Sequence, residues 1–493
     1  MRRGEDGYQF DLTRLDPAGR GGPLVSGTLD EAGAEVEIVM RHGLAPAEWG
    51  VVYSALVPEG PAVSAGGRVA ADVTVHIPRN APYEAAAHGR IRLSDWRASS
   101  GGDEIVRDLN LALKLDGRSV EARDLSGQTP TGRITGSGAL SMPLGGPLMY
   151  HGRLAARSVP VSVVADLAPA VANAGLKEGQ AGLDFEFRGT AANELTARGH
   201  LDLDAGWRAG PLEHVSGRME FDVRMEGDLA VPRGLRPTGE VSFSDVRLRG
   251  TRGELAFIPS ALLTLSDHRA RLTGLTAETM GGQVSAHGRF TLPRENKAVE
   301  YAVSLASRSP LSAARLASLL GYGDDARAGD VAVNLELAGT GVRAMRVTGT
   351  VAGHVELDTE HPTTVTSRLG IDARLSALTR PGEMQGNGKI EILEATLADP
   401  SGKLLAVAGT IRLDGRNVSA ARLDGDGRFG RFTAKGGAEL SPDMTVDYSG
   451  RLDAERLDVA ELQDAVSGLD WVEDGDASVT VHLERNAGGP HRG

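Results

Sequence analysis

The chain lacks cysteine altogether, which excludes disulfides, thiol catalysis and thiolate metal sites, and permits an oxidising compartment without proving one. Aromatic residues make up only 4% of its 493 residues. Basic runs are missing too, and the net charge of −13 argues against a general nucleic-acid binder, because phosphate contacts need clustered Lys and Arg. Glycine is abundant instead, with 65 residues, which favours many short strands and turns over one thick aromatic core.

Long hydrophobic runs are also missing. The most apolar stretch, Val159–Leu176, is interrupted by Asp166 and two prolines, so no segment approaches the roughly 18 apolar residues of a membrane span. The N-terminal MRRGEDGYQF has no apolar core of the kind that signal peptides carry. We therefore expect either a cytoplasmic protein or a piece of a longer one.

Motifs for catalysis or metal binding are not found. Gly425–Gly430 matches G-x-G-x-x-G, but the residues after it alternate as a strand and do not open a helix, so we interpret the match as chance. Neither His-Glu-x-x-His nor G-x-S-x-G occurs, and the acidic turns lack the twelve-residue calcium loop. We predict that the protein is not an enzyme and that it uses no metal or cofactor.

Internal repetition is the strongest feature of the chain. Leu275–Pro293 aligns without a gap with Leu125–Pro143, at an offset of 275 − 125 = 150 residues, and a more diverged copy begins at Leu423. A fixed offset indicates an array of like units. The glycines expected at equivalent turns of the three copies are Gly132, Gly282 and Gly430.

The repeats predict units of about 150 residues. We place a truncated first unit at 1–104, complete units at 105–254 and 255–403, and an incomplete fourth unit at 404–493. Both ends of the chain fall inside a unit, and neither shows the atypical capping unit that closes an array, so a fragment is expected.

Each unit is expected to contain one short helix. The four candidate helices begin at Pro46, Pro160, Pro310 and Leu457. Ser309 is a suitable N-cap for the third, because it precedes a proline at the first helical position. In the fourth, Asp458 with Glu461 resembles a capping box.

Nearly every predicted strand is two-sided. Leu183, Phe185 and Phe187 alternate with acidic and basic residues, which gives one wet face and one apolar face. The apolar face must be covered by another sheet, by the sheet curling on itself, or by an apolar ligand. The predicted fold class is therefore mainly β: an elongated, repetitive, curled antiparallel-type sheet (a β-groove) with one short helix per repeat.

The repeats resemble the C-terminal region of the AsmA-like proteins, the bacterial envelope superfamily that includes TamB. The resemblance rests on the motif L-x-x-L-x-A-x-x-x-G-G-x-[VI]-x-x-x-G-x-[FL]-x-L at Leu272–Leu292 and on the strand and proline-led helix of Tyr301–Leu320. It covers most of the chain. It implies a periplasmic protein with an inner-membrane anchor, which this chain lacks, and an apolar groove that conducts phospholipids towards the outer membrane.

We therefore expect a non-enzymatic envelope protein that binds phospholipid acyl chains and conducts them between the inner and outer membranes, in outer-membrane biogenesis. Its expected partners are bacterial membranes and envelope proteins, and not nucleic acid. The alternative is a structural or adhesive β-solenoid whose apolar faces pack on each other. A third reading, an enzyme on a β-rich scaffold, is disfavoured because no singular acid breaks the repeat. The residues expected to line the groove are Val73, Val75, Leu183, Phe185, Phe187, Val241, Phe243, Val333, Leu335, Leu337, Val479 and Val481.

Overall fold

A computed structural model covers the chain, and the account below is confined to the residues that it describes. They are 2–4, 7–13, 23–29, 33–40, 63–81, 84–100, 103–129, 132–161, 176–190, 193–209, 212–227, 235–251, 253–292, 298–320, 326–341, 344–357, 363–376, 385–400, 402–428, 430–440, 446–458 and 476–485.

These residues form antiparallel β-strands with a single α-helix, α4 (Ala313–Leu320), so the prediction of a mainly β fold is confirmed. The chain divides into two compact units, which are described separately. The first contains residues 1–208 and 214–241, and the second contains residues 209–213 and 242–493. The boundaries proposed above for four repeats stay a prediction.

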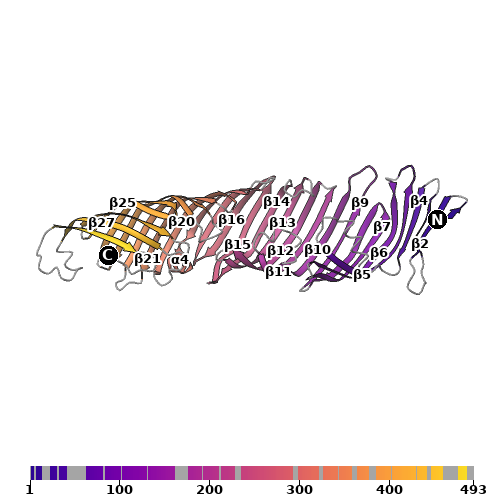
Figure 1. Ribbon diagram of the computed structural model, residues 1–493, viewed down its shortest axis with the longest axis horizontal. Helices are drawn as coiled ribbons and strands as arrows, with labels where there is room; N and C mark the ends of the chain where they lie inside the picture. The colour runs from indigo at the N-terminus through magenta and orange to yellow at the C-terminus, as the bar shows by residue number, and fades with distance from the viewer. Residues whose placement is uncertain are drawn as a thin grey trace. The chain divides into compact units, whose positions relative to one another are not determined.

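In the first unit each strand from β1 to β11 pairs in antiparallel fashion with the next strand of the chain. Strands β5 to β12 accordingly lie side by side in chain order (Figure 1). The strands are β1 (Arg2–Gly4), β2 (Gly7–Thr13), β3 (Pro23–Leu29), β4 (Gly33–Met40), β5 (Val63–Pro78), β6 (Ala86–Ser100), β7 (Asp103–Gly117), β8 (Ser119–Gln128), β9 (Arg133–Ser141), β10 (Met149–Pro160), β11 (Leu176–Thr190), β12 (Glu194–Ala209) and β13 (Leu212–Glu226).

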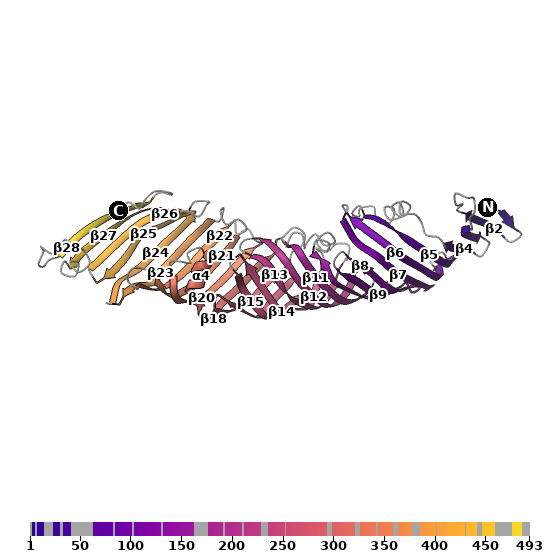
Figure 2. The same ribbon diagram turned by 90° about the horizontal axis from the view of Figure 1, so that it is seen from below.

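In the second unit consecutive strands from β15 onward also pair in antiparallel fashion, except that β18 and the two-residue β19 both pair with β20. Strand β14 (Arg236–Gly250) contributes residues to both units. Figure 2 shows β20 to β28 in chain order. The strands are β15 (Gly253–Ser266), β16 (Arg269–Thr279), β17 (Gly282–Thr291), β18 (Glu300–Ser309), β19 (Leu311–Ser312), β20 (Ala326–Thr340), β21 (Ala344–Leu357), β22 (Thr363–Ser376), β23 (Gln385–Asp399), β24 (Gly402–Gly415), β25 (Asn417–Gly427), β26 (Gly430–Leu440), β27 (Val446–Asp458) and β28 (Asp476–Arg485).

Helix α4 begins later than the sequence predicts. The N–H of Arg315 donates to Ser312 Oγ at 3.4 Å, so Ser312 is the N-cap. The predicted cap, Ser309, instead accepts a hydrogen bond from the N–H of Gln283 at 2.9 Å. The prediction was wrong because Leu311 and Ser312 first pair with β20, which holds them in strand conformation before the helix starts.

Little can be said of the other predicted helices. The segment after Pro46 lies outside the described residues, as do 162–175 and 459–475, which include Glu461. Pro160 is the last residue of β10, and Leu457 and Asp458 end β27.

A glycine with a positive φ recurs at intervals of about 150 residues, close to the offset between the sequence repeats. Gly89, Gly239 and Gly388 have φ values of 142°, 132° and 146°. At each of them a Cβ would overlap the backbone carbonyl of an aspartate on the preceding strand, so only glycine fits. The three glycines predicted at equivalent turns also correspond. Gly132 stands directly before β9, Gly282 begins β17 and Gly430 begins β26.

The packed core is thin. The largest completely buried side chain among the described residues is that of Val161. Small buried clusters form around Val161 in the first unit and around Leu311 in the second, where α4 packs on β20. Most apolar side chains are only partly buried on one face of their strand.

Candidate functional site

Residues directly opposite each other on paired antiparallel strands point to the same face, so the register identifies the members of each face. In the first unit one lateral row crosses β5 to β12 without a charged residue. All its side chains except the buried Val73 are partly exposed. We call this side the apolar face. The row consists of Val73, Gly89, Leu115, Val120, Leu140, Tyr150, Gly189 and Leu195.

The second unit has an equivalent row, which crosses β15 to β18 and β20 to β27. It too contains no charged residue, and most of its members are partly exposed. The row consists of Leu263, Leu272, Gly288, Val303, Leu337, Val347, Ala373, Gly388, Leu413, Val418, Ala438 and Tyr448.

The residues predicted to line a groove all lie in β5, β11, β14, β20 and β28, with the alternation that the sequence predicts. Leu335 is opposite Leu305 and Gly349, and Val481 is opposite Leu452, so these positions share the apolar face of the second unit. Their exposure varies from 5% at Val73 to 43% at Val479. The others, Val75, Leu183, Phe185, Phe187, Val241, Phe243, Val333, Leu335, Leu337 and Val481, are half-buried.

Aromatic side chains concentrate on the apolar face of the first unit. The ring centroids of Phe185 and Phe187 are 5.7 Å apart, and Phe185 lies 6.4 Å from Phe221. Tyr150 lies 6.4 Å from Phe187, and its hydroxyl donates to the carbonyl oxygen of Glu194 at 2.9 Å. Burial raises the pKa of Tyr150, so this hydroxyl stays protonated and continues to donate.

Glycine provides the space in which these rings lie. A Cβ at Gly189 would overlap the ring of Tyr150, and a Cβ at Gly152 would come within 2.7 Å of the Phe187 ring. The pairing recurs in the second unit, where a Cβ at Gly339 would lie 2.6 Å from the Tyr301 hydroxyl. The rings therefore lie across the neighbouring strand and cover its backbone. They do not stand upright as an obstacle within the row.

Part of the apolar face in the second unit is covered by α4. Leu311, Ala313 and Val331 are buried there, and Leu316 and Val333 pack against them. The predicted lining residue Val333 is thus in contact with the cluster below the helix. Leu337, four residues further along β20, is half-buried and is not a member of that cluster.

The opposite face of the same strands is charged. Arg153 donates to both carboxylate oxygens of Asp184, at 2.9 and 2.8 Å, and Arg218 donates to Asp202 at 2.6 and 3.2 Å. These hydrogen bonds hold the pKa of Asp184 and of Asp202 below the ordinary aspartate value. In the second unit Arg451 lowers the pKa of Asp453 in the same way.

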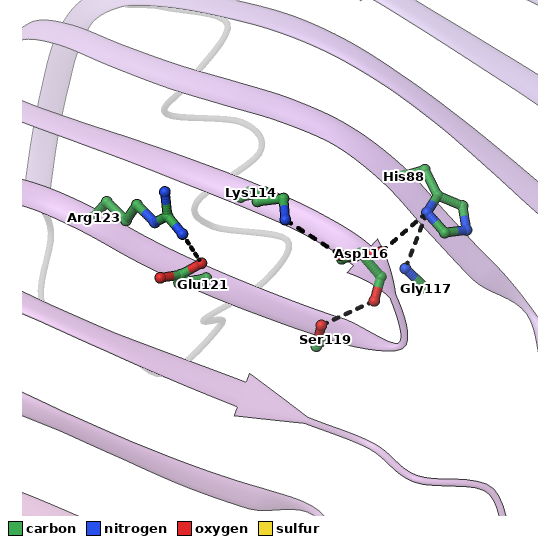
Figure 3. A network of polar contacts seen from close by, with 7 residues as sticks. All are labelled: His88, Lys114, Asp116, Gly117, Ser119, Glu121 and Arg123. Atoms are coloured by element: carbon green, nitrogen blue, oxygen red, sulfur yellow. Dashed lines mark hydrogen bonds and ion pairs between the residues drawn. The ribbon is translucent and has the colours of Figure 1, made fainter.

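A polar network at the β7–β8 turn shows how these charges are satisfied (Figure 3). Lys114 Nζ lies 3.2 Å from the Asp116 carboxylate, and Arg123 donates to Glu121 at 2.6 Å. The N–H of Gly117 donates to His88 Nδ1 at 3.2 Å, which places the proton of a neutral His88 on Nε2. Every contact is lateral or local, and all these charged side chains are largely exposed, which is typical of a solvated face.

Two hollows outlined by the described residues are lined mainly by polar side chains. One of about 840 Å³ in the first unit is lined by Glu121, Arg123, Arg153, Arg198 and Asp222 among others, so it contains both acidic and basic groups. A second, of about 670 Å³ in the second unit, is lined by charged side chains of β21 to β24.

Within the described ranges, no three His, Asp or Glu side chains converge as a metal ion would require. No helix in this part of the chain has both the length and the apolar character needed to cross a membrane. The residues after Gly430 form β26, as expected when the G-x-G-x-x-G match was interpreted as chance.

Sequence reasoning missed the pairing of aromatic rings with glycines. The sequence signal for this pairing is that a tyrosine and a glycine recur at nearly the same offset. Tyr301 follows Tyr150 by 301 − 150 = 151 residues, and Gly339 follows Gly189 by 339 − 189 = 150 residues.

Comparison of the chain with protein-family models, with curated proteins and with solved structures finds no match. The resemblance to AsmA-like proteins therefore rests on the sequence motif alone.

Proposed function

We propose that the apolar face binds phospholipid acyl chains and that the protein conducts phospholipid along it without catalysing a reaction. The observation that carries the proposal is the lateral apolar row in each unit, which crosses strand after strand without a charge while most of its side chains remain partly exposed. A surface of this kind is costly in water unless something apolar covers it.

The dimensions of the row suit an acyl chain. Strands lie about 4.8 Å apart, and one lipid leaflet contributes about 15 Å to a hydrocarbon core of about 30 Å, so a chain lying along the row would cross about three strands. Complete burial is worth about 0.8 kcal/mol per methylene, and contact on one side yields roughly half of that. Several methylenes together give useful affinity without a specific polar contact.

Conduction requires that no residue obstruct the row. The rings of Tyr150 and Phe187 lie over glycines, and in the second unit the two small residues Ala373 and Gly388 lie opposite each other, between Val347 and Leu413. The acyl chain would therefore meet similar apolar contacts at successive strands, while the headgroup stays in water. Shallow, repeated binding of this kind allows movement along the row and needs no single site residue.

The biological setting follows from the resemblance. We propose a protein of the bacterial periplasm that is anchored in the inner membrane, acts in outer-membrane biogenesis and works with other envelope proteins. This setting is supported by the repeat motif at Leu272–Leu292 and by the mainly β fold.

Native mass spectrometry of protein extracted from membranes in mild detergent tests the proposal. We expect co-purified phospholipid that remains bound in the gas phase and is lost from a folded Leu337→Asp variant. The matched control is Glu336→Gln, which changes the neighbouring residue on the charged face and should keep its lipid. Protein that is consistently free of lipid would contradict the proposal and favour the solenoid, whose apolar faces pack on each other.

A further inference from the structure

Exposed apolar side chains gather in the connection between β9 and β10 and at the first residue of β10, in the segment Met142–Met149. Met142, Leu144 and Met149 are 46%, 58% and 47% exposed. The segment reads MPLGGPLM and contains no charged side chain, hydroxyl or amide. Single exposed apolar residues are ordinary, but a cluster within one short segment indicates a contact surface, because surface turns normally carry polar residues.

The corresponding connection of another repeat provides a comparison. The N–H of Met142 donates to the carbonyl oxygen of Arg118 at 3.0 Å, and the N–H of Leu292 donates to that of His268 at 2.7 Å. The donor and the acceptor of the second hydrogen bond each lie 150 residues after those of the first, since 292 − 142 = 150 and 268 − 118 = 150. The second connection continues as LPRENKAVE and carries four charges. The uncharged loop is therefore a property of this one repeat and not of the turn as such.

The backbone of the loop also has few groups that need water. Pro143 and Pro147 have no N–H, and the N–H groups of Met142 and Gly146 donate to Arg118 O and Pro143 O at 3.0 and 3.2 Å. Gly145 has a φ of 69°, which the third position of a tight turn requires, and its turn places Leu144 at the corner. Each backbone group that is satisfied internally, or that has no N–H, lowers the cost of entering an apolar medium.

We propose that Met142–Met149 is a membrane-contact loop that inserts Leu144 and its flanking methionines into the surface of a phospholipid bilayer. A lipid surface fits better than a protein partner, because protein interfaces are typically anchored by Trp, Tyr and Arg with hydrogen-bonding groups around them, and this loop has none. Arg118 donates through Nε to the carbonyl oxygen of Met142 at 2.5 Å, which places a positive charge at the base of the loop, at the depth of lipid phosphates.

This inference does not rest on lipid conduction, because a protein can contact a bilayer whether or not it carries lipid. The absence of cysteine makes a direct test simple. The full chain with Leu144→Cys is labelled with an environment-sensitive fluorophore and mixed with vesicles of phosphatidylethanolamine and phosphatidylglycerol. We expect a blue shift and quenching by brominated acyl chains. Ala298→Cys, an exposed position in the corresponding connection, should show neither. Equal responses at both positions, or none at Leu144→Cys, would overturn the proposal.

A substitution series gives the second arm of the test. Leu144→Asp should lower the affinity for the same vesicles about tenfold, because a buried leucine contributes enough transfer free energy for that factor. Ala298→Asp should leave the affinity unchanged. Both side chains are exposed, so far-ultraviolet circular dichroism should show intact folds. Unchanged affinity in Leu144→Asp would overturn the proposal. Phe185→Asp separates this proposal from lipid conduction, because it should lose bound lipid and keep vesicle binding.

Discussion

The two faces of strand β11 differ in what holds their side chains. On the apolar face Phe185 packs against the rings of Phe187 and Phe221, at 5.7 and 6.4 Å. On the other face Asp184 is held by two hydrogen bonds from Arg153, whose side chain is 57% exposed. Exposed ion pairs contribute little to stability, whereas burial of apolar area is the main favourable term in folding. One face therefore carries most of the packing free energy, and it is the same face on which we propose that an apolar ligand binds.

The largest effect is expected from a charge on the apolar face. Phe185→Asp or Leu335→Asp places a carboxylate among apolar groups, which should stop phospholipid transfer and destabilise the unit by about 3 kcal/mol. Transfer between donor and acceptor vesicles is measured with a fluorescent phospholipid.

The matched control is on the adjacent residue. Asp184→Asn changes only the charged face and should leave transfer near the normal rate. Circular dichroism and protease resistance identify variants that remain folded. A folded Phe185→Asp protein that transfers lipid normally would disprove a path along this face.

An intermediate effect is expected where a glycine supports an aromatic ring. Gly189→Val introduces atoms into the space of the Tyr150 ring, and overpacking of this kind costs about 1–3 kcal/mol. Thermal unfolding should shift to lower temperature. Gly182→Ala on the same strand is the control, because its nearest neighbour would lie at 3.6 Å, an ordinary contact distance. Equal melting temperatures for Gly189→Val and the parent chain would contradict the described packing.

The smallest effect concerns the charged face and pH. The hydrogen bond from Arg218 lowers the pKa of Asp202 below its ordinary value of 3.8. The pair therefore stabilises the fold above pH 3.8, and this contribution is lost as the pH falls through the lower, folded-state pKa. Because the Asp202 side chain is 45% exposed, the contribution should be well under about 1 kcal/mol.

Melting temperatures measured from neutral to strongly acidic pH test this expectation. The difference between the parent chain and Asp202→Asn should shrink at the acid end. Arg218→Gln should behave in the same way, because it removes the other partner. A difference that is constant across the pH range would show that the pair does not contribute through ionisation.

Much of this comparison could be predicted from the sequence. Alternation with a period of two separates Phe185 from Asp184, and a register slip of one residue would reverse every face, so a two-sided strand specifies its register strongly. Gly89, Gly239 and Gly388 recur in the sequence at offsets of 239 − 89 = 150 and 388 − 239 = 149 residues, because only glycine fits where the backbones approach closely.

Other features depend on contacts between strands that local patterns do not encode. The ring of Tyr150 lies over Gly189, 39 residues away as 189 − 150, because the strands happen to pair there. The N-cap is Ser312 and not the predicted Ser309, because Leu311 and Ser312 pair with β20 before the helix begins. The apolar loop at Leu144 was overlooked because its composition becomes unusual only beside the corresponding loop of another repeat.

The central claim is that acyl chains lie on the apolar face, and photo-crosslinking tests it most directly. A phospholipid with a diazirine in its acyl chain is bound to the intact protein and irradiated, and the modified peptides are located by mass spectrometry. The account predicts crosslinks at Phe187 and Leu337 and none at their neighbours Glu186 and Glu336, although carboxylates trap the photoproduct readily. Crosslinks on Glu186 and Glu336, or none on either face, would contradict it.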